Sequence, residues 1–239
     1  MRINSEKGFS LMESTLALAL FLIVVLASLE FFGFTRSLFL KLKDKEETKE
    51  AALSALDKMK TDLLAGGSGL LEPIELGLLE GITQNEGTLV ILSKEINLTP
   101  LNDLLEGQTR IRLQGTHNVK KGREICIFDA HKGEVKSISN ADKESVVLSS
   151  PLNFSFLKEK SQVLLLKKIS LFLDKDKQIL RRKTNSSPAQ PLLEDAILFA
   201  FSYEKASNLA RLHVALTSNK EKKYEISVFP KNAALAFRR

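Results

Sequence analysis

A single carboxylate stands at the entrance to the apolar run of this 239-residue chain. Glu13 directly precedes the sixteen uncharged residues from Ser14 to Leu29. An acidic group at the centre of a bilayer helix costs about 2.5–3.5 kcal/mol and less toward the ends, so such a group normally has a partner or a function. No Lys or Arg lies between Phe9 and Thr35. We therefore expect Glu13 to need a cation from elsewhere, and an α-amino group is the remaining candidate.

The residues before the run suit a chain that is cut in front of Phe9. Gly8 has no Cβ and lets a protease approach the backbone closely. Cleavage there would give Phe9 a free amine inside the membrane. If the helix begins at Phe9, Glu13 lies about 6 Å further along it, at about 1.5 Å per residue.

The segment Gly8-Phe9-Ser10-Leu11-Met12-Glu13 resembles the N-terminal signal of type IV pilins and type II secretion pseudopilins. The resemblance implies cleavage between Gly8 and Phe9 by prepilin peptidase and N-methylation of Phe9. It implies that Glu13 pairs with the N-terminal amine of a neighbouring pilin or pseudopilin subunit during assembly. It also implies a single-pass protein of the cytoplasmic (inner) membrane, with its head outside the cytoplasm, that enters a pilus or pseudopilus after assembly.

Three other interpretations of the N-terminus remain open. Glu13 would be favoured by the helix dipole in the first turn of any helix, by about 0.3–1 kcal/mol. An ordinary signal peptidase would accept Val25-Leu26-Ala27 before Ser28, although Glu6 and Glu13 make an unusual secretory signal. The segment would also serve as a plain uncleaved anchor.

The apolar run suits a single membrane crossing. Ser14–Leu29 is about 24 Å long as a helix, short of a hydrocarbon core of about 30 Å, whereas residues 9–34 cover it with both carboxylates near the edges. Basic residues are more frequent after the run than before it, which would favour the opposite orientation. The cytoplasmic N-terminus is therefore implied by the family resemblance.

The helix is predicted to continue past the membrane. Residues 36–64 contain no Pro or Gly, and Leu53, Leu56, Met59 and Leu63 recur at helical spacing. Gly66-Gly67-Ser68-Gly69 is expected to end the helix. A helix from Phe9 to Leu64 would be about 84 Å long, which suits a shaft.

Beyond the glycines the pattern changes to short strands that are rich in β-forming residues and separated by turn residues. The predicted strands are residues 88–93, 109–114, 123–128, 144–150, 163–173, 197–203, 209–217 and 224–229. The predicted fold is α+β and type IV pilin-like, with the long helix packed on a mainly antiparallel sheet. Its parts are a leader at 1–8, a transmembrane half of the helix at 9–34, an amphipathic half at 35–65 and a β-rich head at 70–239.

The C-terminal third carries a second resemblance. The order KKISLFLDKDKQILRR, PLLEDAILFAFSY, ARLHVALT and YEISVFPKN is similar to the end of the PilW and J-type minor pseudopilin families. It favours a large minor subunit over a major pilin. Type IV pilus, type II secretion and competence systems share the N-terminal signal, which does not discriminate among them.

No catalytic constellation, metal site or cofactor motif is recognised. His117, His131 and His213 are dispersed, and Asp129 and His131 are expected to share a surface turn. The pair Asp174 and Asp176 has a spacing found in calcium loops, but a hairpin turn is the preferred interpretation. The lone cysteine excludes an intramolecular disulfide, and the strand-like stretch around Cys126 predicts core filling.

The positive net charge makes nucleic acid a candidate partner. The net charge is +6 and the pI about 9.3, with local clusters at Arg181-Arg182-Lys183 and Lys220-Lys222-Lys223. No aromatic residue interleaves with the clusters as a stacking platform, so an ordinary solvated surface is preferred.

The function predicted from the sequence is a minor pilin or pseudopilin without enzymatic activity. The alternatives are a soluble periplasmic binding or structural protein released near Ala27, and a DNA-uptake minor pilin. An enzyme is the third alternative.

Overall fold

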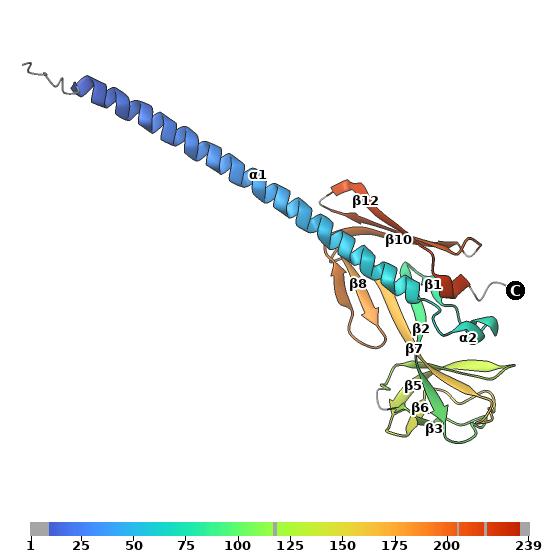
Figure 1. Cartoon of the computed structure of the whole chain (residues 1–239). Coiled ribbons are helices and arrows are strands. Elements are labelled where there is room, and N and C mark those ends of the chain that lie inside the picture. Colours follow the sequence, from blue (N-terminus) through green and yellow to red (C-terminus); the bar gives the residue numbers. More distant parts are fainter. Residues whose placement is uncertain (1–9, 117–118, 205, 218, 235–239) are drawn as a thin grey trace, which may run out of the picture. The chain divides into compact units, whose positions relative to one another are not determined.

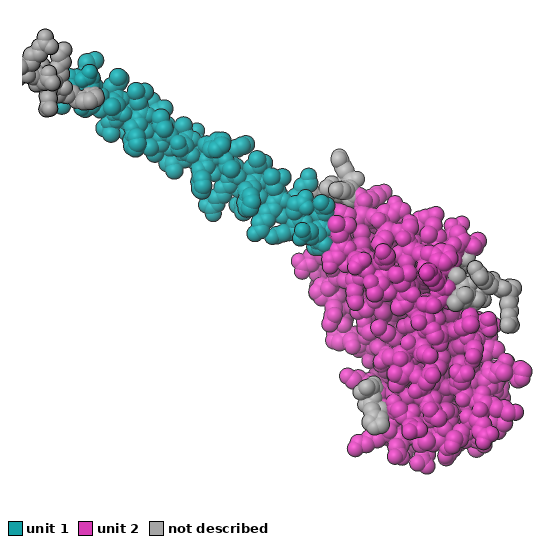
Figure 2. Space-filling model, viewed as in Figure 1, with its two compact units in different colours: residues 1–51 teal, residues 52–239 magenta. Residues whose placement is uncertain are grey.

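The computed structural model of this chain describes residues 10–116, 119–204, 206–217 and 219–234. It divides into two compact units, residues 1–51 and 52–239 (Figure 2). The described helices and strands are, in chain order, α1 (Leu11–Ala65), α2 (Leu71–Glu75), β1 (Ile82–Asn85), β2 (Thr88–Pro100), β3 (Arg110–Gln114), β4 (Glu124–Phe128), β5 (Gly133–Ala141), β6 (Ser145–Leu148), β7 (Gln162–Asp174), β8 (Ile179–Thr184), β9 (Gln190–Leu193), β10 (Ala196–Glu204), β11 (Leu209–Leu216), β12 (Asn219–Val228) and α3 (Lys231–Ala234) (Figure 1).

The prediction of an α+β, pilin-like fold is wrong, because the protein is mostly β. Strands hold 41% of the described residues and helices 30%. Within the described residues the strands form one nine-stranded sheet, β1-β2-β3-β6-β5-β4-β7-β8-β9, and one three-stranded sheet, β10-β11-β12. All eight predicted strands are present, but β1, β5, β8 and β9 were not expected, and β2 continues well past its predicted end at Ser93.

The pattern of β5 explains why the strand content was underestimated. Its buried positions include Glu134 and Lys136, whereas the apolar Val135 between them is 37% exposed. Glu134 and Lys136 form an ion pair of 2.9 Å with both side chains at least nine-tenths buried. Lys136 Nζ also donates to the Pro151 carbonyl (2.7 Å), and Glu134 accepts from the Asn153 amide (3.0 Å). An inward charged face has no hydrophobic alternation from which a strand can be predicted.

Six strands of the large sheet close into a ring. The pairings run β2–β3–β6–β5–β4–β7, and β7 pairs again with β2 along most of its length, all antiparallel. Closure removes the free edges that an open sheet would leave among these strands. The interior of the ring holds one apolar cluster, whose buried members are Leu98, Leu104, Ile111, Leu113, Val119, Ile125, Ile127, Ile138, Val146, Leu148, Leu152, Phe156, Val163 and Leu165.

A β-bulge in β2 separates the ring from a second core. The register with β7 shifts between Lys94 and Ile96, leaving Glu95 as the extra residue. Before the bulge, Leu89 and Ile91 belong to the second core; after it, Leu98 lies in the ring interior. The inserted residue changes which positions of β2 share a face: Leu89 and Ile91 before it and Leu98 after it all stand opposite odd-numbered residues of β7, so they lie on the same face of the sheet.

The second core joins the end of α1 to both sheets. It contains Ala52, Ala55, Leu56, Met59 and Leu63 of α1, together with residues of β1, β2, β7–β9 and the three-stranded sheet. Burial of Leu56, Met59 and Leu63 confirms the predicted helical stripe. Leu53 was expected in the stripe but is 50% exposed, and its place is taken by Ala52 and Ala55.

One buried acid interrupts this apolar stripe. Asp62 is 5% exposed and accepts two hydrogen bonds from the Arg182 guanidinium of β8, Nε to Oδ2 at 2.6 Å and Nη2 to Oδ1 at 3.0 Å. Arg182 Nη1 donates to Thr184 Oγ1 at 2.9 Å. Hydrogen bonding to the Asp62 carboxylate raises the pKa of the Arg182 guanidinium. A bidentate pair of this kind fixes both orientation and distance between the helix and the sheet.

We expect Asp62→Asn to destabilise the protein by about 3–5 kcal/mol, because it leaves the Arg182 cation in a largely buried site without its charge partner. The measurement is chemical unfolding of the full chain in detergent. Asp57→Asn makes the same change at an exposed position of the same helix and should alter stability by less than about 0.5 kcal/mol. Equal effects of the two substitutions would contradict a stabilising role for the pair.

Cys126 is fully buried beside Leu70, Phe128, Leu164 and Leu166, which confirms its prediction as a core residue. Burial raises the pKa of its thiol to about 12. We therefore expect the native thiol to resist alkylation by iodoacetamide at about pH 8, because only the thiolate reacts. Mass spectrometry should show one added group only after unfolding. Rapid alkylation of the native protein would contradict the burial.

Candidate functional site

The structure describes the predicted assembly residue but not the predicted processing site. Gly8 and Phe9, the residues of the predicted cleavage and N-methylation, lie outside the described residues. The description begins at Ser10, and α1 begins at Leu11. Glu13 is therefore the predicted site residue whose surroundings are described, and it lies in the first turn of α1.

Glu13 and Ser10 form a reciprocal capping box. Ser10 N donates to Glu13 Oε2 at 2.9 Å, and Glu13 N donates to Ser10 Oγ at 3.2 Å. These bonds satisfy two backbone donors at the helix start, neither of which has a partner within the helix. In the described chain the hydrogen bonds of the carboxylate use Oε2 and leave Oε1 without one. The Ser-x-x-Glu spacing was visible in the sequence, but Ser10 was not singled out there.

The first unit consists of one helical stretch whose apolar side chains are uncovered. In the described chain, α1 is the helix long and apolar enough to cross a membrane or to act as a signal sequence. Its buried positions begin only at Ala52, and every Leu and Phe from Leu11 to Leu42 is at least 47% exposed. So large an apolar surface needs lipid or other protein to cover it.

The hydroxyl groups of this stretch are compatible with an apolar surrounding. Thr15 Oγ1 donates to the Met12 carbonyl (2.9 Å), and Ser28 Oγ donates to the Val24 carbonyl (2.7 Å). Each hydroxyl thus finds its acceptor within the helix and needs no water. The two carboxylates, Glu13 and Glu30, are the acidic groups that remain between residues 10 and 35.

Beyond the apolar stretch, α1 becomes highly charged. Lys49 pairs with Glu46 at 3.2 Å, and Lys43 pairs with Glu47 at 3.6 Å. All four side chains are at least 44% exposed. Exposed pairs of this kind contribute little to stability, typically about 0.3–0.5 kcal/mol on a helix.

Other predicted candidates occupy turns. Asp129 Oδ1 accepts from the His131 and Lys132 amides at 2.9 and 3.0 Å, which is the expected surface turn. Asp174 ends β7 at the hairpin and forms a 2.9 Å ion pair with Arg181, whose hydrogen bond lowers the pKa of Asp174. Across the residues that the structure describes, no three His, Cys, Asp or Glu side chains are grouped as a metal site.

The basic cluster at residues 181–183 is divided among three environments. Arg181 pairs with Asp174, Arg182 pairs with Asp62, and Lys183 lines a pocket on the opposite face of β8 from Arg182. The cluster therefore does not present three uncompensated cations on one surface. The side chains of Lys220 and Lys222 lie outside the described part of the chain.

Comparison with known proteins identifies no relative. No protein-family model matches the sequence, and a search of curated proteins finds no match. Among solved structures, one similarity covers 32% of this chain and 15% of the Gp54 tailspike of Acinetobacter baumannii bacteriophage AP22 in complex with A. baumannii capsular saccharide, at 13% identity and a TM-score of 0.29. Another covers 62% of this chain and 32% of the phage phi92 endosialidase, at 9% identity and a TM-score of 0.21. Scores this low support no inference about fold or function.

Proposed function

We propose that this chain is a minor pilin or pseudopilin, a structural subunit without enzymatic activity. The observation that carries the proposal is the first unit: an exposed apolar helix with one carboxylate in its first turn. Such a helix needs lipid around it before assembly and neighbouring helices around it afterwards. The resemblance of residues 8–13 to the prepilin signal supplies the family, and the assignment does not depend on the fold of the second unit.

In this proposal prepilin peptidase removes residues 1–8 and exposes the amine of Phe9, which is then N-methylated. Residues 9–34 hold the subunit in the cytoplasmic membrane, with the second unit outside the cytoplasm. On assembly the same helix leaves the lipid and becomes part of the filament core. The apolar surface is covered in both states, so the free energy of transfer between them is small compared with that of exposure to water.

Glu13 aligns the subunit through the amine of a neighbour. The capping box orients the carboxylate toward the helix start and, among the described residues, leaves Oε1 without a hydrogen bond. A charge-assisted bond from an amine would compensate a carboxylate that is otherwise costly in an apolar surrounding. The cap and the intersubunit bond therefore use different oxygens and need not compete.

A role in binding DNA is not favoured by the second unit. Two of the three cations in the most compact basic cluster are already paired with carboxylates, so they have less positive field to offer phosphate. The assembly role needs no such surface.

We expect Gly8→Ala to slow the removal of residues 1–8, because a Cβ beside the scissile bond obstructs close approach of the peptidase. The full chain is co-expressed with a prepilin peptidase, and the precursor and the mature form are separated by electrophoresis. Gly33→Ala is the matched control, since a Cβ there meets no atom within 4 Å. Equal processing of Gly8→Ala, Gly33→Ala and the wild type would contradict the proposed cut site.

Glu13→Gln separates the assembly role of Glu13 from its capping role. Gln retains an oxygen that accepts from Ser10 N but loses the charge, so the helix start is preserved while the pairing with an amine is lost. We expect membrane insertion to be unchanged and the amount of subunit in purified filaments to fall at least tenfold. Immunoblotting of membrane and filament fractions provides the measurement.

Two controls accompany this variant. Glu30→Gln removes the other carboxylate of the apolar stretch, and Ser10→Ala removes one half of the capping box while keeping the charge of Glu13. Both should enter filaments at close to the wild-type level. If Glu13→Gln does so too, Glu13 is a capping residue and not an assembly residue.

A further inference from the structure

The strand β7 has two successive neighbours on one of its edges. Along β7, the pairing with β4 ends where Ile125 stands opposite Leu165, and the pairing with β8 starts where its last residue, Thr184, stands opposite Ile169. The other edge of β7 is occupied by β2. Between the two neighbours the strands fork, and the backbone of residues 166–168 has no strand partner on that edge.

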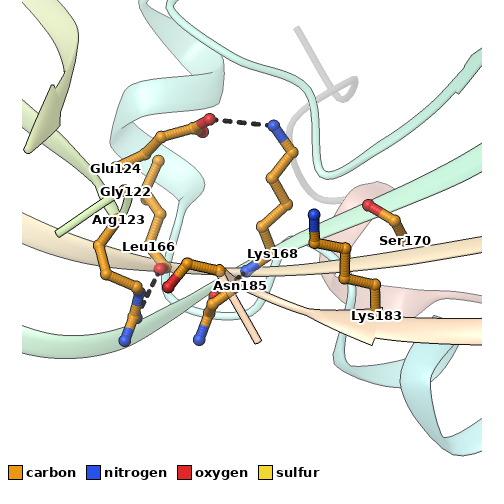
Figure 3. Close-up of a pocket in the computed structure, with 9 residues that line it drawn as sticks. Gly122, Arg123, Glu124, Leu166, Lys168, Ser170, Lys183 and Asn185 are labelled. Carbon is orange, nitrogen blue, oxygen red and sulfur yellow. Dashed lines mark hydrogen bonds and ion pairs between the residues drawn. The ribbon is translucent and has the colours of Figure 1, made fainter. Parts of the chain in front are cut away.

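Side chains satisfy the backbone at this fork. Arg123 Nη2 donates to the Leu166 carbonyl at 2.8 Å. Lys168 N donates to Asn185 Oδ1 at 2.8 Å, and Asn185 N donates to the Lys168 carbonyl at 2.7 Å (Figure 3). Arg123 is in turn held by Glu95, the extra residue of the β2 bulge. Polar side chains therefore take the place of a strand partner at this fork.

A pocket of about 310 Å³ lies at the fork. Leu166, Lys168 and Ser170, alternate residues of β7, lie on one face of the strand and form one wall. Lys183 stands directly opposite Ser170 in the register, and Gly122 and Ser186 complete the rim. The volume is at the lower end of the range for small-molecule sites, about 300–1,000 Å³.

The side chains of the pocket offer donors in excess of acceptors. Glu124 also lines the pocket, and its carboxylate is paired with Lys168 Nζ at 2.9 Å, whereas Lys183 forms no ion pair or hydrogen bond within the described chain. Asn185 Oδ1 accepts one hydrogen bond, from Lys168 N, and the amide nitrogen of the same side chain is a further donor. Arg123 Nε is buried without a hydrogen-bond partner in the part of the chain that is described. Buried donors are normally satisfied, so an unpartnered one calls for an acceptor.

We propose that this fork pocket binds a small molecule through an oxyanion, either a carboxylate or a phosphate group. Lys183 supplies the charge partner, and Ser170, Asn185 and Ser186 supply neutral donors. An oxyanion presents acceptors only and so fits a set of donors that lack acceptors. The absence of an aromatic side chain among the lining residues gives no platform for a nucleobase. This inference is independent of the proposed assembly function.

The test is isothermal titration calorimetry of the full chain in non-ionic detergent, with inorganic phosphate in one arm and malonate in the other. We expect saturable binding of at least one probe with a dissociation constant of about 1 mM or tighter. The tighter of the two identifies phosphate or carboxylate as the natural group. Lys183→Gln should weaken binding at least tenfold, whereas Lys175→Gln, in the exposed turn of the same hairpin, should leave it unchanged.

A second pair of variants tests the pocket independently of Lys183→Gln, in case that variant does not fold. Ser186→Glu places a carboxylate at the exposed rim of the pocket and should abolish binding by repulsion, while Ser187→Glu, next to it but outside the pocket, should not. The proposal is overturned if neither probe binds saturably, or if Ser186→Glu binds as tightly as Ser187→Glu.

Discussion

The packing of the second unit depends on the bidentate bond between Asp62 and Arg182. It places one charged contact inside an otherwise apolar core, where the last turns of α1 meet β8. Apolar contacts alone leave a helix free to slide or rotate over a sheet, whereas two parallel hydrogen bonds allow one register. Ala52 and Ala55 let the same helix approach closely. Within the second unit, the end of α1 is in this way fixed against β8.

β2 and β7 connect the two cores of that unit. Both strands are long, and each contributes to the ring interior at one end and to the helix-bearing core at the other. Between the two cores, β2 carries the bulge at Glu95, and β7 exchanges β4 for β8 along one edge. Arg123 contacts both the bulge of β2 and the place where β7 changes partner, through the Glu95 carboxylate and the Leu166 carbonyl. The proposed oxyanion pocket is a by-product of this exchange of partners.

Sequence patterns recovered the local structure better than its long-range arrangement. The helix, the buried positions Leu56, Met59 and Leu63, the eight strands and the burial of Cys126 followed from periodicity. The fold class did not, because β5 turns Glu134 and Lys136 inward and because closure of the ring depends on pairings between distant strands. The capping box was readable from the Ser-x-x-Glu spacing. The separate roles of Arg181, Arg182 and Lys183 were not, since alternation sends them to two faces and their partners come from other elements.

The central claim is that the chain is stored in the membrane with a free amine at Phe9 and assembles through Glu13. Its most direct test is the mass of the N-terminal peptide of the wild-type chain, purified from the membranes of its own cells. The account predicts a peptide that begins at Phe9 and carries one added methyl group. A peptide that begins at Ser28 would show release by an ordinary signal peptidase, and one that begins at Met1 would show an uncleaved anchor; either result would contradict the account.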